Sequence, residues 1–498
     1  MFELNKNYNN FGRLMILIGI LLLLPLGVLI FYPHEVSYAF DFLLPAAFSI
    51  SLGFLLVLSS KGKSLEDVYL SSDSNLLVLS AWLYGILIGA IPFITGKQVN
   101  TLHALFESVS GWTTTGLSVL DVSLLPKIFL FYRSFMQFCG GLGFILMMTL
   151  FIQNKQAMPL YNAEGHPDKL MPNLKKTSQV ILFIYSSFMI LGVLFYKLAG
   201  MSWFDGICHS MCSLSTGGFS TKLNSIGDYS SIPVELITVF LMLIGTTNFA
   251  VLMLLFRRKF KQAFRVSEVK FLGGLLLVAV PLTTYSLVSQ SQLNLTSGFR
   301  IAFFNTISAL STTGYSSVSF NGWPSAGLFI IILLMLIGGG IGSTAGGMKL
   351  TRVYLLFRGI RDNLRTRFGT TRAVRSPFYY RAGGKTPIDS ATYMDILGFT
   401  GAYMLLYFSG VLAMVLTSQH SLTEVMFEFA SALGTVGLSV GVTSVSASNA
   451  VLVIEMVGML LGRLEIFIVL FGFSTFLNSI KRFISRIVDR NQLSENES

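Results

Sequence analysis

The sequence predicts an all-α polytopic membrane protein with four fused span–loop–span units in pseudo-fourfold symmetry, preceded by two further transmembrane helices. The composition, the apolar runs and an internal repeat support this prediction. Of the 498 residues, 53% are hydrophobic and only 12% are charged, whereas soluble domains are about 25% charged. Residues 14–31 form an apolar run of eighteen residues without a charge. Such a run approaches the roughly 20 residues that cross a ~30 Å hydrocarbon layer.

The N-terminal helix pair is expected within residues 1–62, from the apolar runs at 14–31 and 42–58. The first run is longer than the 7–15 apolar residues of a signal peptide, and no A-x-A cleavage site follows it. We therefore expect the first run to be a retained span.

A repeat of roughly a hundred residues organises the rest of the chain. Four segments align without gaps: Ser110–Ser118, Cys212–Ser220, Ser308–Ser316 and Ser431–Ser439. They share Gly116, Gly218, Gly314 and Gly437, which are 102, 96 and 123 residues apart. These segments predict four units, at residues 63–165, 166–265, 266–385 and 386–498.

Each unit shows the same order of elements. A first apolar span lies near 75–96, 178–199, 269–289 or 392–417. A short amphipathic stretch follows it, at 102–111, 203–214, 298–310 or 422–433, and is too short to cross a membrane. After the shared segment comes a second apolar span, near 128–152, 233–256, 326–348 or 450–478. The pattern predicts ten crossings and four half-helices.

Basic residues cluster at 257–265, 352–385 and 481–490. Cytoplasmic loops of membrane proteins are enriched in Lys and Arg, so we expect both termini to be cytoplasmic in a multi-pass protein of the plasma membrane. The net charge of +11 is explained by these loops. Contacts with membrane lipid headgroups are expected there, and nucleic acid is not an expected partner.

The four shared segments are rich in Thr, Ser and Gly and follow a half-helix. Non-helical backbone at membrane depth is tolerated only where it is buried in protein or faces water. Glycine adopts φ > 0 at little cost, which lets carbonyls turn towards an axis, and carbonyl rings replace the hydration shell of a monovalent cation. The half-helix C-termini, which are partially negative, also favour a cation. Tight extracellular turns are the alternative interpretation.

Further motifs resemble one family. They are Phe131–Gln137, Gly140–Gly143, Gly338–Gly347 and Gly462–Phe467. With the four loops, they make the chain similar to the TrkH subunits of Trk potassium-uptake systems, within the Trk/Ktr/HKT superfamily. The resemblance implies a channel-like pore-forming subunit of the bacterial inner membrane, not an enzyme, with K⁺ as the transported ion and no organic cofactor.

The resemblance also implies a selectivity filter centred on the four shared glycines. Plant relatives with serine at the first position are associated with sodium, so four glycines favour potassium. The fourth loop, with Gly434 and Val436, differs most from the first. The expected filter residues are Thr114, Thr115, Gly116, Thr216, Gly217, Gly218, Thr312, Thr313, Gly314, Thr435, Val436 and Gly437.

A second functional element is expected below the filter. Six of the ten residues in 338–347 are glycine, and each glycine costs a helix up to about 1 kcal/mol. The resemblance implies an intramembrane gate loop; close helix packing through small residues is the alternative. The expected gate residues are Gly338, Gly339, Gly340, Gly342, Ser343, Thr344, Gly346, Gly347 and Arg463.

Arg463 is included because its neighbours are apolar and a charge within a span costs about 2.5–3.5 kcal/mol on insertion scales. A structural ion pair with Glu465 or Glu428 is the alternative.

Other charged residues and partners have open interpretations. Glu107, Asp121, Glu424 and Glu428 concentrate cations near the outer mouth, or are solvated charges or helix-end pairs. Cys139, Cys208 and Cys212 are expected to be small apolar helix residues and not a metal site. The resemblance implies a homodimer bound to a cytosolic nucleotide-binding ring similar to TrkA, with 257–265 and 352–385 as docking surfaces.

Two rival functions are alternatives to a potassium channel. Coupling of potassium transport to sodium or protons stays open. An intramembrane protease is not indicated, because H-E-x-x-H is absent.

Overall fold

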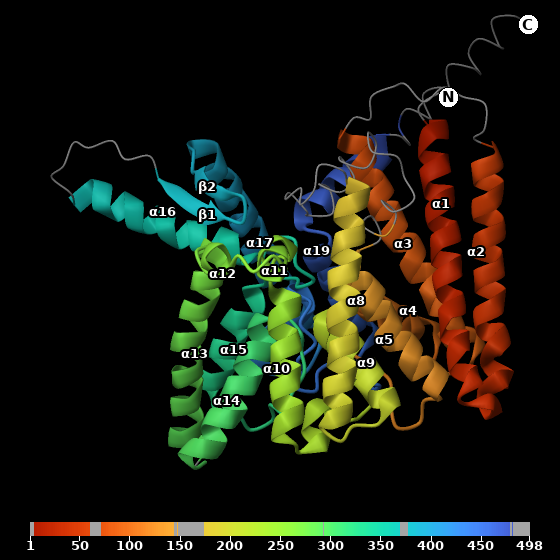
Figure 1. Ribbon diagram of the computed structural model, residues 1–498, viewed down its shortest axis with the longest axis horizontal. Helices are drawn as coiled ribbons and strands as arrows, with labels where there is room; N and C mark the ends of the chain where they lie inside the picture. Colours follow the sequence, from red (N-terminus) through yellow and green to blue (C-terminus); the bar gives the residue numbers. More distant parts are fainter. Residues whose placement is uncertain are drawn as a thin grey trace, which may run out of the picture.

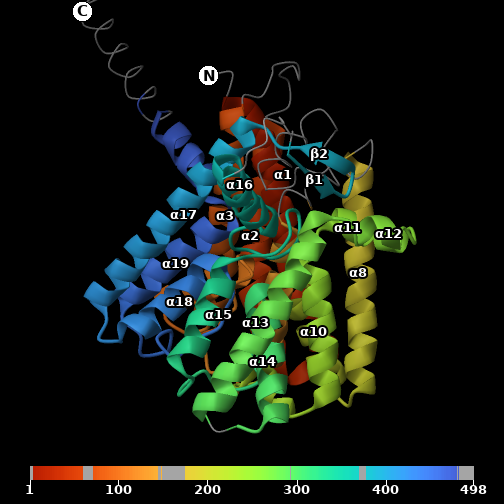
Figure 2. The same ribbon diagram turned by 90° about the vertical axis from the view of Figure 1, so that its left-hand side faces the viewer.

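The structure is a computed structural model that describes residues 4–59, 71–143, 147, 174–291, 293–368, 377–478 and 481. It is an upright bundle of helices with the N-terminal pair at one side (Figure 1). Turned by 90°, the bundle has α17 and α18 on one side, α8 and α10 on the other, and α13 to α15 between them (Figure 2). The predicted all-α membrane fold is confirmed, whereas the unit boundaries stay a prediction.

The N-terminal pair is formed by two helical segments that both continue through 3₁₀ turns. Helix α1 (Leu4–Leu23) runs into η1 (Leu24–Ile30), and η2 (Pro33–Tyr38) leads into α2 (Ala39–Ser59). The two backbones lie close together, because a Cβ added to Gly53 would lie 2.5 Å from the Gly12 carbonyl oxygen. Small residues at helix crossings allow this approach in membranes. Glu35 joins the pair to the first unit by accepting the Lys127 and Ile128 amides at 2.8 and 2.9 Å.

The four units have long outer helices and short half-helices where the repeat predicts them. The outer helices are α3 (Ser71–Thr95), α8 (Leu174–Leu198), α13 (Ser267–Ser291) and α17 (Ser390–Thr417). The half-helices are α4 (Thr101–Trp112), α9 (Trp203–Leu214), α14 (Leu295–Leu310) and α18 (Leu422–Gly434). The side chains of Asn100, Ser202 and Ser421 accept backbone N–H groups at the starts of three half-helices, as N-cap residues do.

Burial separates the half-helices from the outer helices. Most half-helix residues are buried. The outer helices instead present apolar side chains on the outside of the bundle; Leu277 of α13 is 79% exposed and Leu405 of α17 is 70% exposed. Apolar side chains exposed along a long apolar helix are suited to lipid and not to water.

The inner helices differ from the expected second spans. They are α5 (Lys127–Leu142), α10 (Ile232–Thr246), α15 (Ser325–Leu336) and α19 (Asn449–Arg463). Their C-caps lie 27, 29, 23 and 27 residues after the shared glycine. The interruptions after α10 and α19, in the second and fourth units, are not predicted by the sequence, whereas in the third unit α15 ends at Leu336, just before the segment where a loop is expected. Residues 144–146 and 148–152 of the first expected span lie outside the described residues. The chain breaks at a similar distance from the loop in every unit, not only at the glycine-rich segment.

Local geometry explains these breaks. After α10 the chain bends by 111° into α11 (Phe249–Phe256), whose start is capped by the Asn248 side chain. After α19, Glu465 adopts φ 59° and a further apolar helix spans Ile466–Asn478. Within the described residues, six helices are long and apolar enough to span a membrane, or seven with the bent pair. The ten crossings stay a prediction. This number is reached only if each inner helix and the segment that follows its break are counted together as one crossing.

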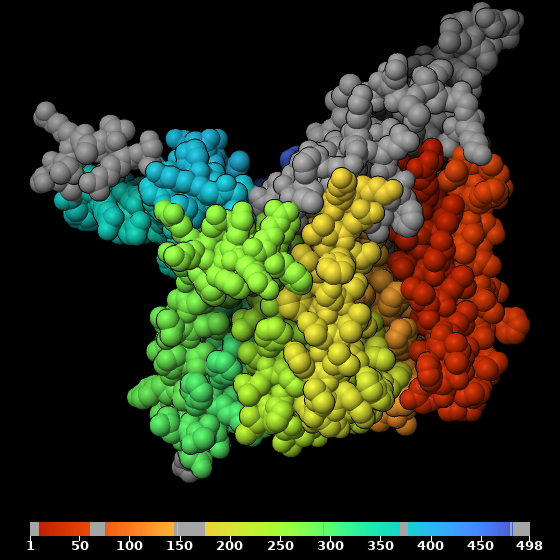
Figure 3. Space-filling view, viewed as in Figure 1, coloured from red at the N-terminus to blue at the C-terminus, as the bar shows by residue number. Residues whose placement is uncertain are grey.

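One end of the bundle gathers the described basic residues of 257–265 and 352–368. It holds α12 (Phe260–Ala263), α16 (Leu350–Phe368) and the antiparallel hairpin of β1 (Phe378–Arg381) with β2 (Gly384–Pro387). The Tyr380 amide donates to Ser267 Oγ at 3.0 Å, which attaches the hairpin to the start of α13. Figure 3 shows α16 and the hairpin standing out to one side of the bundle. The short η3 (Ser225–Tyr229) completes the described elements.

The Gly12–Gly53 contact gives a test of the N-terminal pair. Gly53→Leu is expected to destabilise the protein by about 1–3 kcal/mol, because overpacking forces two backbones apart. Thermal unfolding in detergent measures the effect. Gly398→Leu is the control, because a Cβ at Gly398 meets nothing within 4 Å. Equal melting temperatures for both variants would show that the contact does not stabilise the pair.

Candidate functional site

The four loops share an unusual backbone conformation. The threonine two residues before each shared glycine is left-handed: Thr114, Thr216, Thr312 and Thr435 have φ of 55°, 52°, 55° and 51°. The glycines Gly116, Gly218, Gly314 and Gly437 have φ of 95°, 75°, 80° and 97°, and the residues between do not have positive φ. Non-glycine residues rarely adopt φ > 0, so the surroundings must hold this conformation. A φ that alternates in sign allows successive carbonyls to turn to the same side of a loop.

The loops close into a ring through their glycines. A Cβ added to each shared glycine would collide with a carbonyl oxygen of the next unit. The contacts run Gly116 to Gly217 at 2.2 Å, Gly218 to Thr313 at 2.0 Å, Gly314 to Val436 at 1.9 Å, and Gly437 to Thr115 at 2.2 Å. The fourth contact returns to the first loop. The predicted Thr and Gly residues of all four units therefore surround one axis, and glycine is required at four positions for close approach.

Each loop is tied to its own half-helix by a polar side chain nine residues before the glycine. Glu107 and Glu428 accept the hydroxyls of Ser118 and Ser439 at 2.6 Å. In the other two units, His209 Nε2 lies 3.0 Å from Ser220 Oγ, and Asn305 donates to Ser317 Oγ at 2.9 Å. The four side chains differ in type, but each lies nine residues before the shared glycine and bonds a serine that follows it.

Burial corrects the expectation that Glu107 and Glu428 concentrate cations at the outer mouth. Both side chains are fully buried, so neither is a solvated charge. Glu107 pairs with Arg133 at 3.0 Å, and Arg133 lies 3.9 Å from the centre of the Phe219 ring. Glu424 forms a capping box with Ser421 at the start of α18, as the helix-end alternative predicts.

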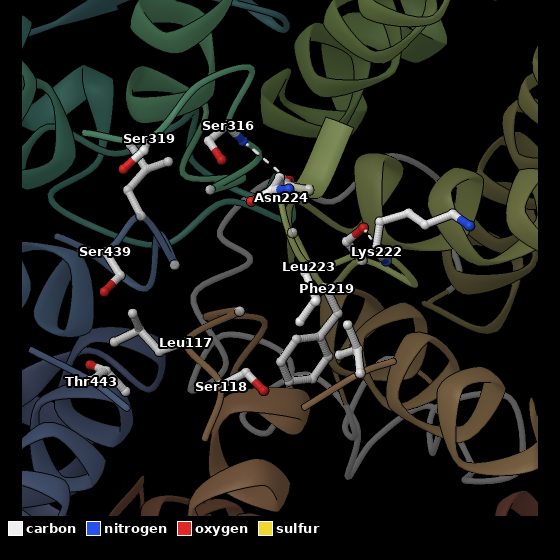
Figure 4. Close-up of a pocket in the computed structure, with 18 of the residues that line it drawn as sticks. Leu117, Ser118, Phe219, Lys222, Leu223, Asn224, Ser316, Ser319, Ser439 and Thr443 are labelled. Carbon is white, nitrogen blue, oxygen red and sulfur yellow. Dashed lines mark hydrogen bonds between the residues drawn. The ribbon is translucent and has the colours of Figure 1, made fainter. Parts of the chain in front are cut away.

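Outside the ring lies a vestibule walled by loops of all four units (Figure 4). Ser118, Phe219, Ser316 and Ser439 line it, one from each unit, and its described lining contains no Asp or Glu. Asp121 is exposed in the first loop, where hydrogen bonds from Ser123 lower the pKa of its carboxyl group. Of the expected acids, Asp121 and the partly exposed Glu424 stay accessible to solvent.

The glycine-rich segment is a non-helical loop between α15 and α16. A parallel bridge between Ile337 and Met348 joins its two ends. A Cβ at Gly338 would lie 1.7 Å from the Gly346 carbonyl oxygen, so the two legs of the loop require glycine. The alternative of close helix packing is wrong, because α15 ends at Leu336 and the glycines pack within the loop.

The loop covers helix ends of the second unit. Gly340 donates to the Thr246 carbonyl at 3.0 Å, and the Thr344 hydroxyl lies 2.9 Å from the Gly245 oxygen and 3.1 Å from the Leu214 oxygen. The last carbonyls of a helix have no partner within the helix. The glycine-rich loop therefore supplies hydrogen bonds that α9 and α10 cannot make for themselves.

The far end of the glycine-rich loop touches the ring from below. Gly346 N donates to Thr312 Oγ1 at 2.9 Å, and Thr344 Oγ1 lies 3.1 Å from Thr216 Oγ1. A Cβ at Gly346 would lie 1.8 Å from Thr435 Oγ1. The loop thus reaches three of the four left-handed threonines. In the described part of the chain, the buried hydroxyls of Thr114 and Thr435 have no hydrogen-bond partner.

Arg463 connects three units beneath the ring. Its guanidinium donates to the carbonyls of Thr344 and Gly140, both at 2.5 Å, and to that of Gly141 at 3.3 Å. Gly140 and Gly141 belong to the C-terminal end of α5, where the helix dipole favours a cation. Of the carboxylates expected to pair with Arg463, Glu465 bonds Arg352 at 2.8 Å.

Two polar residues near the site were not expected from the sequence. Lys349 donates to the Ala345 carbonyl at 2.5 Å and adds a second cation to the glycine-rich loop. Gln137 contacts the second loop from α5. The sequence signals for them were a lysine two residues after the last glycine of the run, and an amide side chain in an apolar stretch. The cysteines Cys139, Cys208 and Cys212 are free and buried, as expected.

The family model described as TrkH, cation transport protein, matches residues 40–483. The Trk system potassium uptake protein TrkH of Halomonas elongata is 30% identical over 93% of this chain and 97% of its own length. The TrkG protein of Escherichia coli is 30% identical over 93% and 96%. The crystal structure of the potassium transporter TrkH from Vibrio parahaemolyticus superposes with a TM-score of 0.81 at 27% identity, covering 94% of this chain and 98% of that one. The chain therefore belongs to the TrkH family of cation transport proteins, which are multi-pass membrane transporters and not enzymes.

Proposed function

We propose that this chain is the pore-forming subunit of a Trk potassium-uptake system and that K⁺ crosses along the axis enclosed by the four loops. The observation that supports this most strongly is the closed ring of glycine–carbonyl contacts. Relatives that match nearly the whole chain are named potassium uptake proteins. The driving force is the membrane potential, which is worth about 2.3 kcal/mol per charge at 100 mV.

The selectivity filter is made by three residues of each loop. Their carbonyls replace the water shell of the ion, and the left-handed threonines form its lowest level. The C-termini of the half-helices α4, α9, α14 and α18 end at these loops, so their negative ends favour a cation. The filter residues are Thr114, Thr115, Gly116, Thr216, Gly217, Gly218, Thr312, Thr313, Gly314, Thr435, Val436 and Gly437.

The gate is the glycine-rich loop together with Arg463. The loop contacts Thr216 and Thr312 directly under the filter, and Arg463 holds it through the Thr344 carbonyl. A cation at the level of Arg463 also repels K⁺. Opening withdraws the loop, which breaks its bonds to Arg463 and to the C-terminus of α10. The gate residues are Gly338, Gly339, Gly340, Gly342, Ser343, Thr344, Gly346, Gly347 and Arg463.

The proposed partners are those that the family resemblance implies, and the distribution of charge suggests where they would bind. Basic residues of α12 and α16 lie at one end of the bundle, which we assign to the cytoplasmic side of a bacterial inner membrane with both termini. This end would dock a cytosolic nucleotide-binding ring similar to TrkA, and two copies of the chain would form a homodimer. Movements of the partner would reach the gate through α16, which follows the glycine-rich loop directly.

The filter is tested by serine at each shared glycine. Gly116→Ser, Gly218→Ser, Gly314→Ser and Gly437→Ser are each expected to lower discrimination between Rb⁺ and Na⁺ by about 10-fold or more, equivalent to about 1.4 kcal/mol. The reason is that the new Cβ displaces a ring carbonyl. Rubidium uptake into proteoliposomes with sodium competition measures the ratio.

The control for the filter variants is Gly401→Ser in α17, where an added Cβ meets nothing within 4 Å. It should transport as the wild type does. Four unchanged Rb⁺/Na⁺ ratios at the shared glycines would contradict the proposed filter, and no rubidium uptake by the wild type under any gating condition would contradict the pore.

The gate is tested by Arg463→Ala. Loss of the guanidinium frees the Thr344 carbonyl and removes a positive charge, so resting rubidium flux should rise about 10-fold, a change of about 1.4 kcal/mol in the barrier. Arg13→Ala on an exposed face of α1 is the charge-matched control. Resting flux and single-channel openings that match those of the wild type would show that Arg463 takes no part in the barrier.

A further inference from the structure

The second filter loop lacks a hydrogen bond between two of its own side chains that the first and third loops have. We call this bond the internal brace. In the first loop, Thr115 Oγ1 lies 2.7 Å from Thr113 Oγ1. In the third, Thr313 Oγ1 lies 2.8 Å from Ser311 Oγ. The second loop has Ser215 at the position of the first partner but Gly217 at the position of the second. It therefore cannot form this bond within itself.

Gln137 of α5 supplies a brace to the second loop from outside. Its Nε2 donates to the Gly217 carbonyl at 2.6 Å, and its Oε1 accepts the Phe219 amide at 3.0 Å. The side chain is fully buried. A buried amide must satisfy both ends, and here both ends are bonded to one loop on either side of the shared Gly218.

Gln137 also explains why position 217 is glycine. Gly217 does not have a positive φ, so backbone conformation does not require glycine there. A Cβ at this position would lie 2.4 Å from both Cδ and Oε1 of Gln137. The other loops have Thr115, Thr313 and Val436 at the equivalent position. The glutamine and the glycine fit each other across two units of the chain.

The bonded carbonyl belongs to the ring of contacts between the loops, which the proposed function assigns to the ion path. The Gly217 oxygen is one of the four oxygens that face the shared glycines, together with those of Thr115, Thr313 and Val436. A carbonyl that accepts a short hydrogen bond offers less negative charge to a second partner. Within the described residues, the Gly217 carbonyl of this ring is shared with a side-chain amide donor.

We propose that Gln137 is a positioning and specificity-determining residue of potassium transport, which holds the second loop and weakens ion binding at this ring by sharing the Gly217 carbonyl. The inference rests on the proposed function of the four loops as the ion path. Weaker binding at one ring lets the ion leave, because conduction requires sites that bind ions but also release them.

The test exchanges the external brace for an internal one. Gly217→Thr alone should abolish rubidium uptake, because its Cβ collides with Gln137. Gln137→Ala alone should lower Rb⁺/Na⁺ discrimination, because the loop loses both bonds. The double variant Gln137→Ala/Gly217→Thr should recover uptake, because a threonine at position 217 has the Ser215 hydroxyl as a partner, as in the third loop.

The double variant should also bind its ion more tightly than the wild type. The half-saturating rubidium concentration should fall about fivefold, which converts to about 1 kcal/mol, the net worth of one hydrogen bond. Maximal uptake should fall as well. A double variant no more active than Gly217→Thr, or one with the half-saturating concentration of the wild type, would overturn the inference.

A volume-matched variant keeps the test decisive if the alanine variants do not fold. Gln137→Met fills similar space without a donor or acceptor and should show lower Rb⁺/Na⁺ discrimination, whereas Gln290→Met makes the same change at an exposed site of α13 and should have no effect. Gly116→Ser is measured alongside. If it lowers discrimination and Gln137→Met does not, only the role of Gln137 is wrong; if neither does, the proposed filter is wrong as well.

Discussion

Four stretches of non-helical backbone meet at one axis inside the membrane, and each depends on its neighbour to do so. Carbonyls approach to 1.9–2.2 Å from the place that a Cβ would occupy on the shared glycines, so the ring closes only while all four glycines are present. Backbone of this kind is stable in a membrane only when it is buried in protein or faces water. The Arg133–Glu107 pair and the side chains that tie each half-helix to its loop supply that burial. Together they hold four threonines in a conformation that threonine rarely adopts.

Backbone groups below the ring must also find hydrogen-bond partners within the protein. Each inner helix ends there, which leaves carbonyls without partners inside the helix. The glycine-rich loop bonds the carbonyls at the end of α10, and Arg463 bonds those at the end of α5. The groups that satisfy the helix ends are therefore the groups that lie beneath the ring. A movement that opens the path must leave these carbonyls to water, which links opening to hydration of the space under the loops.

Much of this architecture could be predicted from the sequence. The half-helices were placed to within a few residues, because four aligned segments fix their ends and short length excludes a span. The glycine-rich segment 338–347 marked the break of the third inner helix, and Asn248, a capping residue, marked that of the second. The break of the fourth could not be placed, because Leu464 is apolar and gives no turn signal. Contacts between residues of different units could not be predicted from the sequence either. Gln137 and Gly217 are 80 residues apart, and their fit follows from packing that no local pattern records. Glu107 was expected at a surface and is buried, because its partner Arg133 comes from another helix.

The central claim is that the four loops form one shared ion path. Anomalous diffraction from crystals in thallium, a heavy substitute for potassium, tests it directly. Anomalous peaks are expected on the axis inside the ring of Gly116, Gly218, Gly314 and Gly437, with the level of the Gly217 carbonyl less occupied than its neighbours. Peaks that lie outside this ring, with the axis empty while the loops are ordered, would contradict the claim.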